Sequence, residues 1–212
     1  MLDPALGPKA CAAARADGPE AAVRVLYSGF DGPTLVRGPR GHGIAAIRAV
    51  DPVARVWPSG DAARLRLCAR QPAALDGTGL RAFASIDPVD DGEPAGEWQL
   101  ALAWLRLGLS TRLAAAVVTY LDGRTVGGQP QSQLQLIKGA LADIAIAHLD
   151  VHTALGAPAL TADELGDMHE QLTDADRAAL LLLGAAGFVA DGPGVLAHVS
   201  ELLADAYVRS TR

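Results

Sequence analysis

The sequence predicts an α+β protein in which a small, partial β-rich domain is followed by a four-helix up-down bundle. Three observations support this class. Short alternating runs separated by Gly and Pro turns fill residues 20–90, apolar residues recur at helical spacing after Glu97, and residues 85–96 between them are acidic, aperiodic and rich in Gly and Pro. We therefore expect two domains, residues 1–90 and 91–212, joined by a linker at residues 85–96.

The predicted strands of the first domain are short and carry arginines. Arginines alternate with aliphatic residues in several runs, which is the pattern of a sheet with one solvated or partner-covered face. The runs are AAVRVLYSG (21–29), TLVRG (34–38), GIAAIRAV (43–50), VARVW (53–57) and ARLRLCA (63–69). We interpret these arginines as the wet face of a sheet rather than as ligand-binding residues.

Four helices are predicted in the second domain. The first carries an apolar stripe from Trp98 to Val117 and ends at a turn at residues 120–128, and the second carries a stripe from Leu134 to His148. A cap-like sequence, TADE (161–164), begins a leucine-rich third helix, and a last helix covers residues 195–208. The aromatic content of only 4%, in a chain that is half hydrophobic, is typical of tightly packed helices.

Charge and apolar run length argue against several classes of function. The net charge of −6 and the pI near 5.3 disfavour a nucleic-acid-binding surface, which needs clustered Lys and Arg. The longest uncharged apolar run, residues 178–190, is shorter than the roughly 20 residues that span a bilayer, so we expect no membrane helix. The N-terminal residues do not have the pattern of a secretory signal, and Cys11 and Cys68 form no CxxC pair. A reduced, cytoplasmic protein is the simplest expectation.

One stretch, YLDGRTVGGQPQSQLQLIKGALAD (120–143), gathers uncharged hydrogen-bonding side chains around a single arginine. Arg124 lies at the end of the first predicted helix, and a Gly-Gly turn and four glutamines around Pro130 follow it. An arginine can donate two parallel hydrogen bonds to a pyrophosphate, and amides can donate to and accept from an adenosine without adding charge. The same side chains could instead cap helix ends and satisfy carbonyl groups at a helix–helix turn.

This stretch resembles the C-terminal helical domain of flavin-dependent acyl-CoA dehydrogenases. The family pattern is matched without a gap by Tyr120, Arg124, Gly128, Pro130, Gln135 and the LADI sequence at residues 141–144. A second block, LLLLGAAGFVADGPG (180–194), resembles a glycine-containing helix end of the family through Gly184, Gly187 and Phe188, and Asp51, Pro52 and Arg55 resemble a phrase near the end of its β-domain. For the glycine block alone, a simple helix cap is the alternative reading.

The resemblance implies a flavoprotein oxidoreductase of lipid metabolism that binds FAD and an acyl-CoA substrate. It also implies a homo- or hetero-oligomer with acyl-CoA dehydrogenase-like chains, because in the family the arginine turn reaches the flavin site of a neighbouring subunit. The residues that it assigns to the cofactor are Arg124, Gly128, Gln135, Gly184 and Gly187.

The sequence also departs from the family. Five positions lack the residues that hold FAD in the family, namely Val126, Gly127, Gln129, Leu181 and Ala185. The N-terminal helical domain and the first half of the β-domain have no counterpart in the sequence, so we expect FAD to be bound only with a partner, or not retained.

The catalytic base is a further departure. The usual glutamate after the last helix has no counterpart, and the slot that a minority of the family uses on the first helix falls on Trp98. Glu97, the candidate base, is one residue away, about 100° around a helix. A helix-start residue favoured by the macrodipole is the alternative for Glu97.

No metal site is predicted. His148 and His152 are one helical turn apart but lack a third ligand, and we interpret His148 as a packed core residue. The acidic residues at 163–167 are typical of a solvated helix start, and Ser110 has no nucleophile-elbow context.

Two functions therefore remain open. The first is an acyl-CoA dehydrogenase-like subunit that contributes to a shared FAD site for α,β-dehydrogenation of an acyl-CoA thioester. The second is a catalytically inactive helical scaffold or oligomerisation module derived from that family.

Overall fold

The computed structural model describes residues 2–46, 53–86, 96–189 and 192–208. Most of the predicted linker at residues 85–96, together with Asp51 and Pro52 of the upstream family-like phrase, lies outside the described residues. The predicted division between residues 90 and 91 also falls there, and it stays a prediction.

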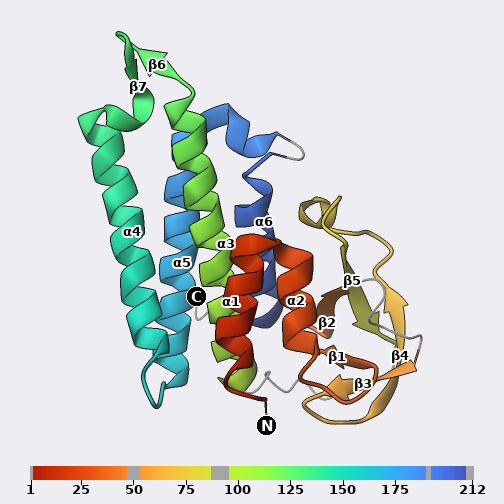
Figure 1. The fold of residues 1–212 in the computed structure, drawn as a ribbon. Coiled ribbons are helices and arrows are strands. Elements are labelled where there is room, and N and C mark those ends of the chain that lie inside the picture. Colours follow the sequence, from red (N-terminus) through yellow and green to blue (C-terminus); the bar gives the residue numbers. More distant parts are fainter. Residues whose placement is uncertain (1, 47–52, 87–95, 190–191, 209–212) are drawn as a thin grey trace.

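The β-rich part is a five-stranded sheet that lies at one side of the molecule (Figure 1). The strand order is β1-β3-β4-β5-β2, in which β1 pairs with β3 in parallel and the other neighbours are antiparallel. The strands are β1 (Thr34–Val36), β2 (His42–Ala46), β3 (Val53–Trp57), β4 (Ala62–Leu67) and β5 (Leu80–Ser85). β5, absent from the predicted strands, lies between β4 and β2 and is largely buried, with Ile44 opposite Ala82 in the register.

The helices confirm the predicted mixed fold with a helical majority. They are α1 (Leu6–Ala16), α2 (Pro19–Tyr27), α3 (Gly96–Asp122), α4 (Gln135–Leu155), α5 (Ala162–Leu183) and α6 (Val195–Tyr207). The last four run up and down side by side, and a small hairpin of β6 (Thr125–Val126) and β7 (Gln129–Pro130) projects beyond the end of the bundle between α3 and α4 (Figure 1). The predicted cap of α5 is a complete capping box between Thr161 and Glu164.

The prediction of a strand at residues 21–29 was wrong, because α2 occupies this segment. Its buried residues, Ala22, Val23 and Leu26, recur at helical spacing, and Pro19 begins the helix at a position where no backbone N–H is needed. The alternation of Val and Arg predicts a strand, but packing against the rest of the core favours a helix here.

One buried cluster joins side chains from both predicted domains. Trp98 at the start of α3 makes edge-to-face contacts with Tyr27 of α2 and Tyr207 of α6, with ring centroids 5.7 and 5.4 Å apart. The hydroxyl of Tyr207 accepts a hydrogen bond of 2.7 Å from the backbone N–H of Ile44 in β2. The aromatic contacts therefore hold α2 and α6 against α3, and the buried hydrogen bond joins the sheet to α6.

α3 is the central helix. Within the described part of the chain it alone is long and apolar enough to cross a membrane, but 61% of its most apolar window is buried inside the structure. A core helix of a bundle has these properties, and the expectation that the chain does not enter a membrane stays a prediction.

Candidate functional site

The end of the bundle at the α3–α4 connection holds the predicted arginine turn. Val126 pairs with Gln129, so the loop of the hairpin is only Gly127 and Gly128, with φ of +59° and +82°. Positive φ at both loop residues is the type I′ geometry that glycine adopts without strain. The hairpin therefore accounts for Gly128 by local geometry, whether or not the residue also approaches a cofactor.

Arg124 is exposed at the base of this hairpin. Its guanidinium carbon lies 4.3 Å from the centroid of the Tyr120 ring, a cation–π contact that orients the side chain. The nearby carboxylate of Asp122 accepts a short hydrogen bond from Ser132. No ion pair is recorded for Arg124 among the described residues. Gln135, the first residue of α4, is likewise exposed at this end.

The predicted glycine block lies at the same end of the bundle (Figure 1). Gly184 ends α5 with φ of +55°, and its N–H bonds the carbonyl of Leu180. Gly187 is buried in the short 3₁₀ helix Gly184–Phe188, where the backbone of Gly194 approaches its carbonyl so closely that a Cβ on Gly194 would lie 1.8 Å from that oxygen. A single buried cluster contains the end of α3, the start of α4 and the end of α5. The fold therefore brings both predicted segments together.

Glu97 lies at the other end of α3. Its carboxylate accepts a hydrogen bond of 2.8 Å from the backbone N–H of Leu2. At 1.5 Å per residue, α3 separates Glu97 from Arg124 by about 40 Å. Within one chain these two residues therefore cannot serve the same site.

A buried polar cluster at the centre of the bundle was not anticipated from the sequence. Arg106 of α3 is fully buried and donates four hydrogen bonds across the bundle. Its acceptors are Ser200 Oγ at 3.1 Å, His169 Nδ1 at 3.0 Å, the His169 carbonyl at 2.9 Å and Thr173 Oγ1 at 2.7 Å. Asp176 of α5 is also buried here, and neither of its carboxylate oxygens has a hydrogen-bond partner among the described residues.

Burial shifts the ionisation of this cluster. Loss of solvation raises the pKa of Asp176 to about 6, although the hydroxyls of Ser110 and Ser200 and the charge of Arg106 oppose the rise. Burial lowers the pKa of Arg106 to about 10, and burial with the neighbouring Arg106 lowers the pKa of His169 to about 3. His169 is therefore neutral, its Nδ1 accepts from Arg106, and its Nε2 donates to the carbonyl of Gln99 at 3.2 Å.

The sequence did contain a signal for this cluster. His169, Thr173 and Asp176 follow one another at four- and three-residue spacing on α5, the face that also buries Leu165, Leu172 and Ala179. Polar residues at core-facing helical positions usually require buried partners.

His148, which the apolar stripe predicted as a packed core residue, is only half-buried beside this cluster. Its Nε2 lies 2.7 Å from Ser110 Oγ, and burial lowers the pKa of the ring. His152 instead packs edge-on against Trp104, with centroids 5.3 Å apart. In the described ranges no three His, Cys, Asp or Glu side chains lie close enough together to hold a metal ion.

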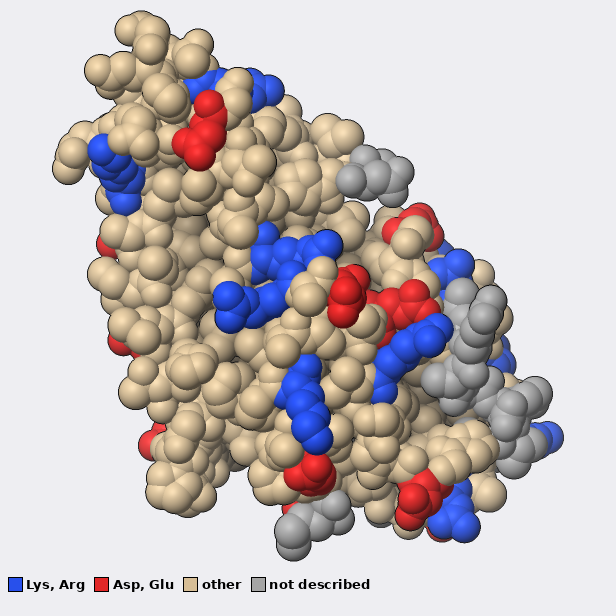
Figure 2. Space-filling view, viewed as in Figure 1, with Lys and Arg blue, Asp and Glu red and all other residues tan. Residues whose placement is uncertain are grey.

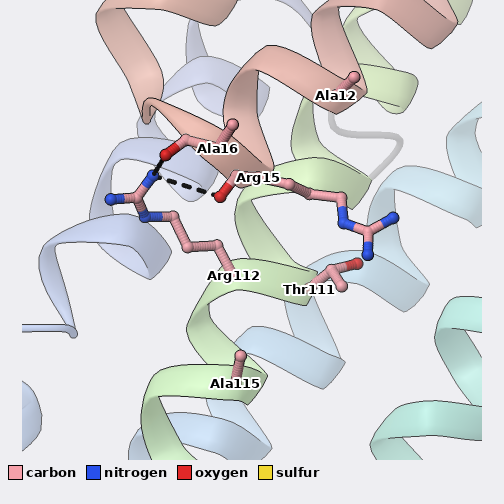
Figure 3. A pocket seen from close by; sticks show the side chains of 6 residues that line it. All are labelled: Ala12, Arg15, Ala16, Thr111, Arg112 and Ala115. Atoms are coloured by element: carbon pink, nitrogen blue, oxygen red, sulfur yellow. Dashed lines mark hydrogen bonds between the residues drawn. The ribbon is translucent and has the colours of Figure 1, made fainter.

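Two cavities lie elsewhere. One of about 440 Å³ is lined by residues of α1 and α3 near the end of α1 (Figure 3). There Arg112 donates to the carbonyls of Arg15 and Ala16, and the guanidinium of Arg15 points the opposite way, past Thr111. The two arginines do not converge on one anion. The other, of about 560 Å³, lies beside α6 and is bordered by Asp76, Glu201 and Asp205, so it disfavours a pyrophosphate.

No protein-family model and no curated protein matches the sequence. Solved structures with a similar fold include a protein assigned as an acyl-CoA dehydrogenase from Mycobacterium smegmatis, with 15% identity, a TM-score of 0.53, and coverage of 85% of this chain and 65% of that one. Another is FkbI, for biosynthesis of the methoxymalonyl extender unit of FK520, with 16% identity, a TM-score of 0.53, and coverage of 95% and 73%. A glutaryl-CoA dehydrogenase from M. smegmatis in complex with FADH2 has 14% identity and a TM-score of 0.49, with coverage of 82% and 56%.

These similarities show the fold. The chain has the mixed fold of acyl-CoA dehydrogenases, which confirms the predicted resemblance at the level of architecture. It spans 56–65% of the length of the first two M. smegmatis dehydrogenases.

Proposed function

We propose that the chain is an acyl-CoA dehydrogenase-like subunit that contributes the α3–α4 end of its bundle to a flavin site shared with another chain. One observation carries the proposal. Arg124 is exposed at this end without a recorded ion pair, at the same pole of the bundle as the Gly184–Phe188 segment. A cation that contacts the Tyr120 ring and forms no ion pair with the described residues suits the pyrophosphate of a dinucleotide.

The residues at this end fit an anionic cofactor in part. Arg124 would donate to the pyrophosphate, and the amide of Gln135 would bond the adenosine portion. When bound, FAD would supply the acceptor for the hydride that leaves the acyl chain. Neither cavity described above is lined by Arg124 or Gln135, which is why the proposal places the remaining contacts on a second chain.

Proton abstraction is assigned to the partner. Glu97 bonds the N-terminal segment and lies about 40 Å along α3 from Arg124. A catalytic carboxylate must reach the proton that it removes, so Glu97 cannot act at the site that Arg124 serves in the same subunit.

An oligomerisation module without catalysis is the second candidate, and a surface favours it. Large apolar side chains are exposed along α4 and at the end of α5, namely Leu136 (88% exposed), Ile146 (57%), Leu149 (64%) and Leu181 (83%). Charged side chains gather over α1 and α2, whereas few interrupt the α4 side of the same view (Figure 2). Such apolar surface is typical of a face that another chain covers.

Arg124→Ala distinguishes the two candidates. The chain would be co-expressed with acyl-CoA dehydrogenase-like chains of the same organism, and FAD content and assembly would be measured on the purified complex. A shared-site subunit should assemble normally while its FAD affinity falls about 10- to 100-fold, since a charge-assisted hydrogen bond contributes roughly 1.5–3 kcal/mol.

The matched control is Arg177→Ala, which removes an exposed arginine that is paired with Glu201. This variant should leave FAD binding unchanged. If the complex assembles and holds the same amount of FAD with and without Arg124, the flavin-site proposal is contradicted and the oligomerisation module is favoured.

A further inference from the structure

The polar centre of the bundle draws on all four of its helices. The contributing residues are Arg106 and Ser110 on α3, His148 on α4, His169, Thr173 and Asp176 on α5, and Ser200 on α6. All but His148 on α4 and Thr173 on α5 are buried, so these two residues are where the cluster approaches the surface.

Asp176 is the unsatisfied member of the cluster. Both of its carboxylate oxygens are fully buried, and neither has a partner in hydrogen-bonding geometry among the described residues. The hydroxyls of Ser110 and Ser200 lie beside the carboxylate and favour its charged form. A buried ionised carboxylate without a hydrogen-bond donor is costly. The protonation state of Asp176 therefore depends on whether these hydroxyls donate to it.

The other neighbours of Asp176 are already occupied. Arg106 directs its donors at Ser200, His169 and Thr173. Both ring nitrogens of His169 are bonded, one to Arg106 and one to the carbonyl of Gln99. Glu201 of α6 adds a like charge that disfavours ionisation of Asp176. Ser200 accepts from the Arg106 cation, which cannot take up a further proton, whereas Ser110 contacts His148, so Ser110 is the group through which a proton on Asp176 can move.

Ser110 has one proton and two neighbours that compete for it. Its Oγ lies 2.7 Å from His148 Nε2 on one side and beside Asp176 on the other. If the hydroxyl donates to His148, its oxygen lone pairs are left for a protonated Asp176. If it donates to an ionised Asp176, its oxygen must accept from a protonated Nε2 of His148.

His148 connects this pair with the solvent. The ring is half-buried. Among the described residues, Nδ1 has no hydrogen-bond partner, and it is not fully buried. A proton on Nδ1 can therefore exchange with water while Nε2 faces Ser110.

We propose that Asp176, Ser110 and His148 form a proton relay that connects the centre of the bundle with the solvent beside α4. When the Ser110 hydroxyl turns to form a hydrogen bond with Asp176 and takes up its proton, Ser110 passes its own proton to Nε2 of His148, and Nδ1 of His148 releases one proton to water. The result is one ionised carboxylate, one proton in solution, and a neutral histidine whose proton has moved from Nδ1 to Nε2. The site needs no flavin and no partner chain.

The tautomer of His148 tests the relay, because a merely packed histidine would not change it. Long-range ¹H–¹⁵N NMR of the purified protein would follow both ring nitrogens from pH 8 to pH 5. The neutral ring should carry its proton on Nε2 above the titration of Asp176 and on Nδ1 below it, and a doubly protonated ring is recognised separately because both nitrogens then carry protons.

Three variants sharpen the test. Ser110→Ala should abolish the tautomer change, and Asp176→Asn should hold the Nδ1-protonated form throughout, because its amide donates permanently to Ser110. Ser200→Ala is the matched control: it removes a hydroxyl that lowers the pKa of Asp176 but does not contact His148, so the change should persist with its midpoint moved to higher pH. A wild-type tautomer that stays constant across the range, or a change that survives in Ser110→Ala, would overturn the relay.

Discussion

Two arginines associated with α3 have opposite environments. Arg106 is fully buried near the middle of the helix and directs four hydrogen bonds at three residues on α5 and α6. Arg124, just beyond the end of the same helix, is exposed and its described contact is the ring of Tyr120. The donors of Arg106 are bonded within the fold, whereas the guanidinium of Arg124 donates no hydrogen bond to the described residues. The buried arginine should therefore control stability, and the exposed one should control binding.

Removing the buried arginine should have the largest effect on stability. Arg106→Ala leaves the hydroxyls of Thr173 and Ser200 and the carbonyl of His169 without their donor, and it removes a positive charge that favours ionised Asp176. Loss of one member of a buried ionic network costs about 3–5 kcal/mol. Urea unfolding followed by circular dichroism should show this decrease in the free energy of unfolding.

The control for this variant is again Arg177→Ala. Its ion pair with Glu201 is exposed, and such pairs contribute about 0–1 kcal/mol. If the two substitutions cost the same, the cluster is not the stabilising feature that its geometry implies.

Asp176→Asn should change how stability depends on pH. The pKa of Asp176 in the folded protein, about 6, lies above its ordinary value of 3.8, so the folded state binds more protons between these two values. The stabilisation from protonated Asp176 is complete below about pH 4 and is lost as the pH rises through 6. The variant should therefore exceed wild type by up to about 3 kcal/mol at pH 8, and this advantage should vanish near pH 4.

His169 supplies the opposite slope. Its pKa falls from 6.5 to about 3 on folding, so its contribution is present above pH 6.5 and is lost as the pH falls toward 3. In wild type the two slopes partly cancel between pH 6 and pH 4. In Asp176→Asn the opposing slope is removed, and the contribution of His169 should lower stability with acidification by up to about 1.4 kcal/mol per pH unit. Parallel unfolding curves for the two proteins over this range would contradict the assignment.

The exposed end could be predicted from the sequence because its signals are local. Arg124, the Gly127-Gly128 loop and Gln135 lie within twelve residues of one another, and the turn that joins them is specified by the two glycines. Whether the end binds FAD was not decided by these residues, since a hairpin alone also requires the glycines.

The buried cluster could not be assembled from the sequence because its partners are distant. Arg106 meets His169 and Ser200 across 63 and 94 residues, and no helical period reports which faces of two helices meet. The absence of tertiary contacts from the sequence also explains the error at α2. Its alternation of Val and Arg predicts a strand, and only its packing on α1 and α3 shows why it is a helix. β5 was missed in the same way, since its pairing with β2 joins residues that are far apart in sequence.

A pair of glycines tests the contrast between the two regions at the smallest scale. Gly108 lies between Arg106 and Ser110 on α3, and a Cβ there would lie 2.4 Å from the carbonyl oxygen of Cys11 and 2.7 Å from the Cβ of Ala14. Because that carbonyl belongs to the backbone of α1, Gly108→Ala must push the two helices apart, at a cost of about 1–3 kcal/mol.

Gly139 is the matched position near the exposed end. It lies in the first turns of α4, and a Cβ would meet nothing within 4 Å. Alanine has the higher helix propensity, so Gly139→Ala should stabilise the protein by about 0.5–1 kcal/mol. Thermal unfolding of the two variants should therefore move the midpoint in opposite directions. If Gly139→Ala instead lowered the unfolding midpoint as much as Gly108→Ala does, α4 would be as closely packed at this end as α3 is at its centre. The contrast between a closed centre and an open end would then not hold.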